Sequence, residues 1–165
     1  MKSVIACFLI ALVVSPLAQA ACTYDVAPIQ TFFDALAIKE EYVGPLSTRE
    51  RNSAGGYTTT NLNGSWVIKK VGPSSWEFLG EFCTSSICQS MFDSYRIEDG
   101  CLKSGDATLN VMEATPLVLE YHREVADRGR LIKRFVRTTD PETLRIFDDW
   151  FEGKRLMQSS RFNGR

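Results

Sequence analysis

Arginine side chains on otherwise apolar strand faces are the residues of this sequence best suited to chemistry. Arg123 follows Tyr121 at two-residue spacing, and Arg134 lies between Ile132 and Val136. A charge that faces a dry interior costs several kcal/mol unless it is paired, so each arginine needs a partner. That partner is a ligand carboxylate or phosphate held bidentately, or an internal acid, unless the arginine reaches water at a strand end. The internal acids considered are Asp93, Glu113 and Asp148.

Signatures of catalysis are scarce. The sequence has no GxSxG, no glycine-rich phosphate loop and no HExxH, and its single histidine, His122, alternates outward beside Glu120. Asp148 and Asp149 are adjacent, so on a strand their carboxylates point to opposite faces and cannot form a glycosidase pair. We predict no catalytic residue, no metal and no cofactor, and we lean against an enzyme.

The cysteines predict two disulfides. Cys7 belongs to the N-terminal leader described next, which leaves Cys22, Cys83, Cys88 and Cys101. An even number in an exported chain indicates disulfides, although sequence alone leaves their pairing open. Cys83 and Cys88 are close enough to bridge across one turn, which slightly favours the pairs Cys83–Cys88 and Cys22–Cys101. A metal site is disfavoured because CxxC is absent.

The N-terminus predicts export. Lys2 precedes an apolar run, Val4–Val14, and small residues at Ala18 and Ala20 suit cleavage after residue 20. This run is too short to span a membrane, so we expect a secreted or periplasmic protein with no stable membrane span. Without residue 2 the formal charge moves from −1 to −2. That balance disfavours bulk nucleic-acid binding.

The mature chain reads as one domain with a helix, a loop and a β-rich region. Residues 28–41 carry a helical apolar period, and we expect this helix to plug or support one end of the fold. Residues 44–64 are polar and rich in glycine, which predicts a long loop. The segment 21–64 therefore precedes a β-domain over 65–165. The helical face consists of Ile29, Phe32, Phe33, Leu36 and Ala37.

From residue 65 onward, short runs with strand-like alternation are separated by turn residues. Short connections can join only antiparallel neighbours, and closure would remove the unpaired edges. We therefore predict a mainly β fold, an antiparallel up-and-down barrel of about eight strands. The predicted strands are Ser65–Val71, Ser75–Phe82, Ser90–Ile97, Thr108–Ala114, Leu117–Val125, Leu131–Arg137, Leu144–Phe151 and Arg155–Phe162.

Gly64-x-Trp66, at the start of the first predicted strand, resembles the lipocalin and wider calycin pattern. The resemblance implies that Trp66 closes the barrel floor, that Arg161 lies across it, and that the barrel receives a small apolar molecule. A rival resemblance exists in residues 29–36, which are similar to the opening helix of nuclear-transport-factor-2-like domains. That fold needs further helices before and between its strands, and residues 44–64 show none, so this resemblance ranks second.

Two classes of function follow, and an enzyme of the nuclear-transport-factor-2-like kind is a distant third. The first is an exported binding protein for a small hydrophobic or amphipathic molecule, with Arg123 or Arg134 as anchor. The alternative is a protein-interaction domain, an inhibitor or envelope accessory factor, with a filled barrel and contacts through residues 44–64 or 83–88. The predicted pocket lining is Trp76, Phe78, Phe82, Leu109, Tyr121 and Phe135.

Overall fold

The structure is a computed structural model that describes residues 22–126 and 128–165. The predicted signal peptide, residues 1–20, lies outside these described residues. The elements are α1 (Ala27–Lys39), β1 (Glu41–Arg51), β2 (Tyr57–Gly72), β3 (Ser75–Cys83), β4 (Cys88–Glu98), β5 (Cys101–Ser104), β6 (Ala107–Thr108), β7 (Asn110–Ala114), β8 (Val118–Val125), β9 (Gly129–Thr139), β10 (Glu142–Glu152) and β11 (Arg155–Gly164).

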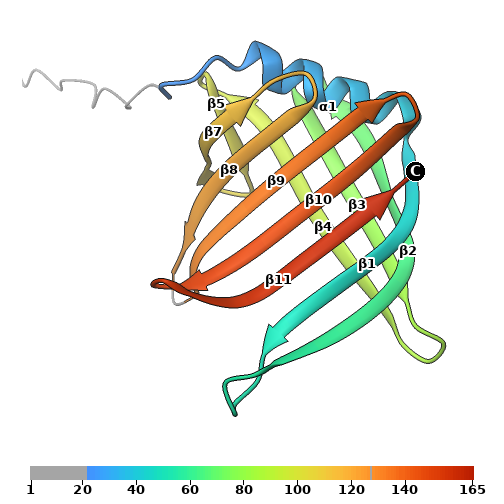
Figure 1. The fold of residues 1–165 in the computed structure, drawn as a ribbon. Helices are drawn as coiled ribbons and strands as arrows, with labels where there is room; N and C mark the ends of the chain where they lie inside the picture. The colour runs from blue at the N-terminus through green and yellow to red at the C-terminus, as the bar shows by residue number, and fades with distance from the viewer. Residues whose placement is uncertain (1–21, 127) are drawn as a thin grey trace, which may run out of the picture.

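The strands form one antiparallel sheet that curls into a nearly closed barrel (Figure 1). The strand order is β6-β5-β4-β3-β2-β1-β11-β10-β9-β8-β7, so the first and last long strands, β1 and β11, pair directly. The edge strands β6 and β7 are separated in the chain only by Leu109. Helix α1 lies across one end of the barrel. We call the opposite end, where the β8–β9 and β10–β11 turns lie, the mouth.

Helix α1 plugs its end of the barrel, as the apolar period predicts. Pro28 lies in the first turn, and Glu40, with a φ of 68°, follows the last turn. On the polar face, Asp34 accepts a hydrogen bond of 2.9 Å from Nε1 of Trp76 and forms an ion pair of 2.8 Å with Lys70. These contacts fix the rotation of the helix on the barrel. The residues of its fully buried face are Ile29, Phe32, Phe33 and Leu36.

The predicted loop between Gly44 and Gly64 is wrong, because these residues form most of β1 and the first half of β2, joined by a short turn. The two strands pair along their whole length and place Gly44 opposite Gly64. Threonines at 58–60 are β-branched and favour a strand. A Cβ on Gly64 would lie 1.8 Å from the carbonyl oxygen of Glu81. Glycine therefore marks close strand packing here and not a flexible connection.

All eight predicted strands are present as strands, but the barrel has eleven. The prediction missed β1 and also β5, whose four residues are too few to show a period. It also merged β6 and β7, which divide at Leu109. No helix lies between the strands within residues 22–126 and 128–165. The nuclear-transport-factor-2-like arrangement, which needs such helices, is therefore excluded for this part of the chain.

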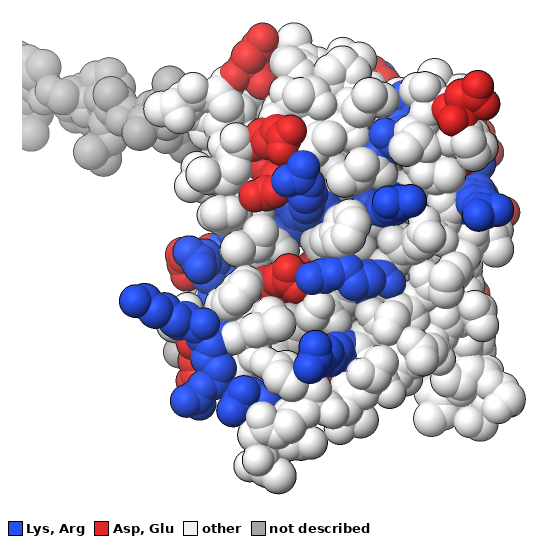
Figure 2. Space-filling view, viewed as in Figure 1, with Lys and Arg blue, Asp and Glu red and all other residues white. Residues whose placement is uncertain are grey.

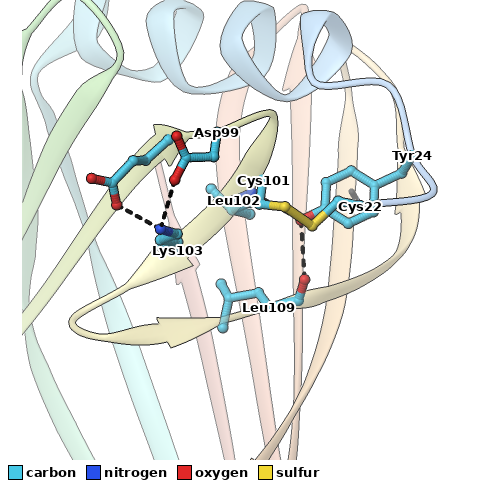
Figure 3. Close-up of a disulfide and its surroundings, with 8 residues drawn as sticks. Cys22, Tyr24, Asp99, Cys101, Leu102, Lys103 and Leu109 are labelled. Atoms are coloured by element: carbon cyan, nitrogen blue, oxygen red, sulfur yellow. Dashed lines mark hydrogen bonds and ion pairs between the residues drawn. A yellow bond between two sulfur atoms is a disulfide. The ribbon is translucent and has the colours of Figure 1, made fainter. Parts of the chain in front are cut away.

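The hydroxyl of Tyr24 closes the seam between β5 and Leu109, the residue that joins β6 to β7 (Figure 3). It accepts a hydrogen bond of 2.8 Å from the backbone N–H of Leu102 and donates one of 3.1 Å to the carbonyl of Leu109. The N–H of Leu109 in turn bonds to the carbonyl of Leu102 at 2.9 Å. Burial raises the pKa of Tyr24, which keeps its hydroxyl proton in place.

Both disulfides match the pairing favoured by their spacing. Cys22–Cys101 ties the segment before α1 to the start of β5, next to Tyr24. Cys83–Cys88 joins the end of β3 to the start of β4, at the tip of the β3–β4 hairpin. Figure 1 shows β5 near α1 and the β3–β4 hairpin extending past the opposite end, so the two cross-links lie toward different ends of the barrel.

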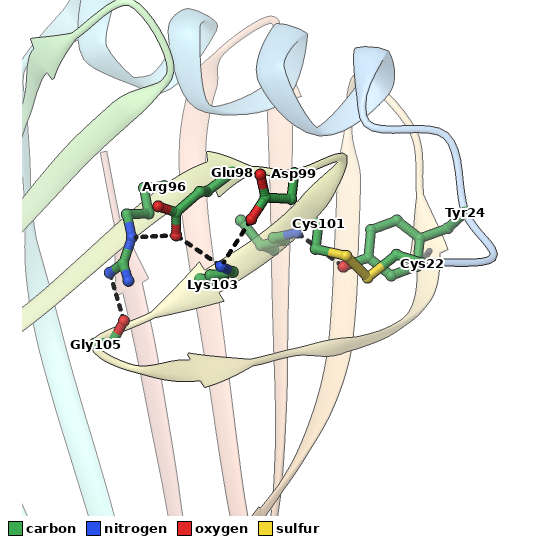
Figure 4. A network of polar contacts seen from close by, with 9 residues as sticks. Cys22, Tyr24, Arg96, Glu98, Asp99, Cys101, Lys103 and Gly105 are labelled. Carbon is green, nitrogen blue, oxygen red and sulfur yellow. Dashed lines mark hydrogen bonds and ion pairs between the residues drawn. A yellow bond between two sulfur atoms is a disulfide. The ribbon is translucent and has the colours of Figure 1, made fainter. Parts of the chain in front are cut away.

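A group of charges lies beside the first disulfide on the β4–β5 hairpin (Figure 4). Glu98 accepts a hydrogen bond of 2.6 Å from Lys103 and one of 3.3 Å from Arg96, and Lys103 lies 3.6 Å from Asp99. Arg96 also donates to the carbonyl of Gly105. The hydrogen bond from Lys103 lowers the pKa of Glu98. Each of these charges therefore has a protein partner on the β4–β5 hairpin or the turn after it.

Candidate functional site

The inward side chains of β8, β9, β10 and β11 lie in three rows, because the strand register aligns them across the sheet. Nearest α1, the apolar row consists of Leu119, Phe135, Ile146 and Phe162. Next comes the polar row of Tyr121, Lys133, Asp148 and Ser160. Nearest the mouth is the cavity row of Arg123, Leu131, Trp150 and Gln158.

The half of the barrel between α1 and the polar row is filled. The ring of Phe33 stacks at 5.0 Å on Tyr95, and its centroid lies 5.0 Å from that of Trp76. Five of the residues predicted to line a pocket lie in this packed core, where they support the plug and do not face the cavity. They are Trp76, Phe78, Phe82, Leu109 and Phe135.

Between the polar row and the mouth the barrel is hollow. A cavity of about 1070 Å³ is lined by side chains of β2, β4, β5 and β8 to β11, and the mouth residues Arg128 and Glu152 border it. Small-molecule pockets commonly span roughly 300–1,000 Å³. Tyr121 and Arg123 are the predicted site residues that reach it. Its apolar lining is supplied by Trp66, Met91, Leu131, Trp150 and Met157.

The polar row holds a cluster of charges at the floor of the cavity. Lys133 is 5% exposed and contacts two carboxylates, with a hydrogen bond to Asp93 of β4 and a distance of 3.5 Å to Asp148. Beside this cluster, the hydroxyls of Tyr95 and Tyr121 form a hydrogen bond of 3.0 Å with each other. The cation is thus shared between two opposite walls of the barrel.

Burial raises the pKa of Asp148 to about 6, although Lys133 opposes this effect, and repulsion from Asp93 adds to it. Burial lowers the pKa of Lys133, but its two carboxylates outweigh that effect and raise it above the usual value. Lys133 therefore stays charged, while Asp148 titrates near mildly acidic pH. Oδ1 of Asp148 is buried and has no hydrogen-bond partner among the residues that the structure describes.

The two arginines proposed as anchors lie on opposite sides of the wall. Arg123 faces the cavity and forms no ion pair with the residues described in 22–126 and 128–165. Arg134 faces outward and pairs with Glu120 at 2.8 Å and with Glu113 at 3.2 Å. The proposed ligand role of Arg134 inside the barrel does not fit this position, because the inward residues of β9 are its neighbours Lys133 and Phe135.

Arg161 also departs from its expected place. The lipocalin resemblance put it across Trp66, but it lies outside the barrel, over the ring of Phe147, and binds Asp149 through two hydrogen bonds of 2.7 and 2.9 Å. Trp66 itself is 4% exposed and packs edge-on against Phe78 and Phe82. The barrel thus shares the buried tryptophan of the pattern but not its covering arginine.

Two smaller predictions about orientation are confirmed. His122 points outward, 3.6 Å from Glu120. Asp148 lies inside the barrel with Lys133, while its neighbour Asp149 lies outside with Arg161. The adjacent carboxylates therefore cannot act on one substrate.

Positive charge gathers at the mouth, over the β8–β9 and β10–β11 turns at the lower left of the view (Figure 2). The described cations there are Arg128, Arg130, Lys154 and Arg155, against the acids Glu124 and Glu152. The sequence adds one further acid to this region, at position 127, which reduces the positive excess without cancelling it. An anion approaching the mouth is therefore favoured over a cation.

The sequence did not single out Lys133, which stands at the centre of the polar row. In β9 both faces carry large apolar residues, Leu131 and Phe135 on one side and Ile132 and Val136 on the other. Alternation alone therefore could not show which face is inside. The usable signal was in β8, where the partner row of Tyr121 was assigned correctly.

Neither a metal centre nor a membrane helix is found in the described part of the chain. Glu81 lies close to Cys83 and Cys88, but the two sulfurs are joined in a disulfide and cannot serve as thiolate ligands. None of the described helical residues forms a helix long and apolar enough to cross a membrane.

The chain matches no family model and no curated protein sequence.

Proposed function

We propose that this protein is an exported, lipocalin-like binding protein whose barrel cavity receives a small amphipathic molecule. The observation that carries the proposal is the hollow half of the barrel, a cavity of about 1070 Å³ that opens at the mouth. A molecule of this class would place its apolar part against Trp66, Trp150 and Leu131 and its polar group near the charged floor or Arg123.

The plug supplies a packed core that does not depend on a molecule in the cavity. Helix α1 and the aromatic core fill only the far half, so folding does not require the strands to collapse onto one another near the mouth. Two members of the polar row have partners outside it, since Lys133 bonds to Asp93 and Tyr121 bonds to Tyr95. The alternative, an interaction domain, assumed a filled barrel, and this assumption does not fit the hollow half.

A titration with N-phenyl-1-naphthylamine, an uncharged amphipathic fluorophore, tests the proposal. We expect saturable binding to the disulfide-intact protein, weakened about tenfold by Leu131→Trp, which fills the cavity. Ile132→Trp is the matched control, because Ile132 is the adjacent residue on the outer face. Loss of binding in both variants alike, or no saturable binding by the native protein, contradicts the proposal.

Native mass spectrometry of protein purified from its own host provides a second test. A co-purifying small molecule that is lost from Leu131→Trp but retained by Ile132→Trp supports a carrier. A bare chain mass together with a bound protein partner would favour the interaction domain instead.

A further inference from the structure

We infer that the ligand of this cavity is an amphipathic anion, that Arg123 binds its head group, and that Asp148 sets the pH at which it is held. The inference rests on the proposed function, since it names the chemical class of the molecule that enters the same cavity. The head group can be a carboxylate, sulfate, sulfonate or phosphate, all of which a guanidinium binds through parallel hydrogen bonds.

The first support is that the cations around the cavity differ in their ion-pair partners. Lys133, at the floor, already has two carboxylate partners, Asp93 and Asp148. Arg123, one row closer to the mouth, has no ion-pair partner among the residues described. The guanidinium of Arg123 is therefore not engaged by a described carboxylate, and it lies deeper in the barrel than Arg128, which borders the cavity at the mouth. The apolar wall that would take the rest of the molecule lies next to it, because Leu131 is its cross-strand neighbour and Trp150 follows in the same row.

The second support is the charge of the path to Arg123. The mouth is basic on the side of the β8–β9 and β10–β11 turns (Figure 2). An anion is thus drawn toward the opening on the same side of the barrel as Arg123, which lies on β8 just before the first of these turns.

The floor adds a response to pH. Asp148 faces Lys133 from β9, Asp93 and Tyr95 from β4, and Tyr121 from β8. With both aspartates ionised, the floor carries one more negative charge than Lys133 neutralises, and it repels an anion held at Arg123. When Asp148 takes up a proton the floor becomes neutral, because Lys133 keeps its charge against Asp93. The affinity for an anion therefore rises as the pH falls through the range in which Asp148 titrates.

The test compares two fluorophores that share one ring system. 8-Anilinonaphthalene-1-sulfonate carries a permanent sulfonate, and N-phenyl-1-naphthylamine lacks it. We expect Arg123→Leu to weaken sulfonate binding about tenfold and to change binding of the uncharged probe less than about twofold. Arg134→Leu, which removes an arginine from the outer face of the neighbouring strand, should change neither.

Between pH 7.5 and 5.5 we expect the native protein to bind the sulfonate about fivefold more tightly and the uncharged probe unchanged. Asp148→Asn should remove this pH dependence. If that variant does not fold, the comparison of Arg123→Leu with Arg134→Leu still decides the anchor.

The outcomes separate the two proposals. Binding of both probes with equal loss in Arg123→Leu, or weaker sulfonate binding at acidic pH, overturns the anion inference and leaves the cavity function standing. Failure of both probes to bind the native protein overturns the cavity function itself, and the inference with it.

Discussion

The two halves of this barrel are built on the same strands but have different roles. Toward α1, inward positions carry aromatic and aliphatic side chains that pack around Phe33. Toward the mouth, the next inward positions carry Tyr121, Lys133 and Asp148 and then open into the cavity. The interior thus changes from packed apolar side chains to charged ones between one row and the next. The comparison teaches that stability and binding are separated along the barrel axis, so each half can be changed with a different consequence.

The largest expected effect is the loss of the aromatic ring at the centre of the filled half. Phe33→Ala leaves a cavity among Trp76, Phe78 and Tyr95, and we expect it to lower the free energy of unfolding by about 4 kcal/mol. Urea denaturation followed by circular dichroism measures this change. Ile38→Ala, on the same helix at an 83% exposed position, is the control and should have little effect. A small effect of Phe33→Ala would mean that the plug contributes little to stability.

The second-largest loss of stability is expected from a substitution at the boundary between the halves. Lys133→Met removes the cation shared by Asp93 and Asp148 and leaves both carboxylates without it. We expect a loss of about 3 kcal/mol in the free energy of unfolding at neutral pH, measured in the same way. The loss should shrink at acidic pH, where the unpaired carboxylates can take up protons. Equal losses at both pH values would show that the methionine perturbs packing and not charge.

The third effect is a pH dependence: titration of Asp148 should change the free energy of unfolding by about 2 kcal/mol. Its pKa is raised from 3.8 in the unfolded chain to about 6 in the fold, so the folded state binds this proton more tightly. The resulting stability is present below pH 4 and is lost as the pH rises toward 6. Relative to Asp148→Asn, the native protein should therefore lose stability between pH 4 and pH 7.5. Ser160→Ala, in the same row, keeps Asp148 and should therefore differ from the native protein by the same amount at both pH values.

The smallest effect is expected in the hollow half. Arg123→Leu should change the free energy of unfolding by no more than about 0.5 kcal/mol, because this arginine has no ion pair among the described residues and borders open space. Thermal unfolding of the variant beside the native protein measures the difference. A loss as large as that of Lys133→Met would show that Arg123 is a structural residue, and the division between the halves would not hold.

The sequence was sufficient to predict which residues are buried in the filled half, but not which residues form the polar row at its boundary. The helical period of α1 and the alternation of β3 showed their buried faces directly, because polar residues occupy the other face. In β1 and the first half of β2, glycine and polar residues suggested a loop, since the close contact that requires Gly64 depends on a strand distant in sequence. In β9 both faces are apolar, so only the register with β8 and β10 places Lys133 inside and Arg134 outside.

The seam at Tyr24 has a consequence for the integrity of the wall. The N–H of Leu109 bonds directly to the carbonyl of Leu102, but in the opposite direction one phenolic oxygen stands between the amide of Leu102 and the carbonyl of Leu109. A hydroxyl can accept from one and donate to the other, whereas phenylalanine can do neither. One of the two hydrogen bonds between these residues is therefore direct and the other passes through a single side-chain oxygen, which is held by a segment that precedes the described strands and is cross-linked by Cys22–Cys101.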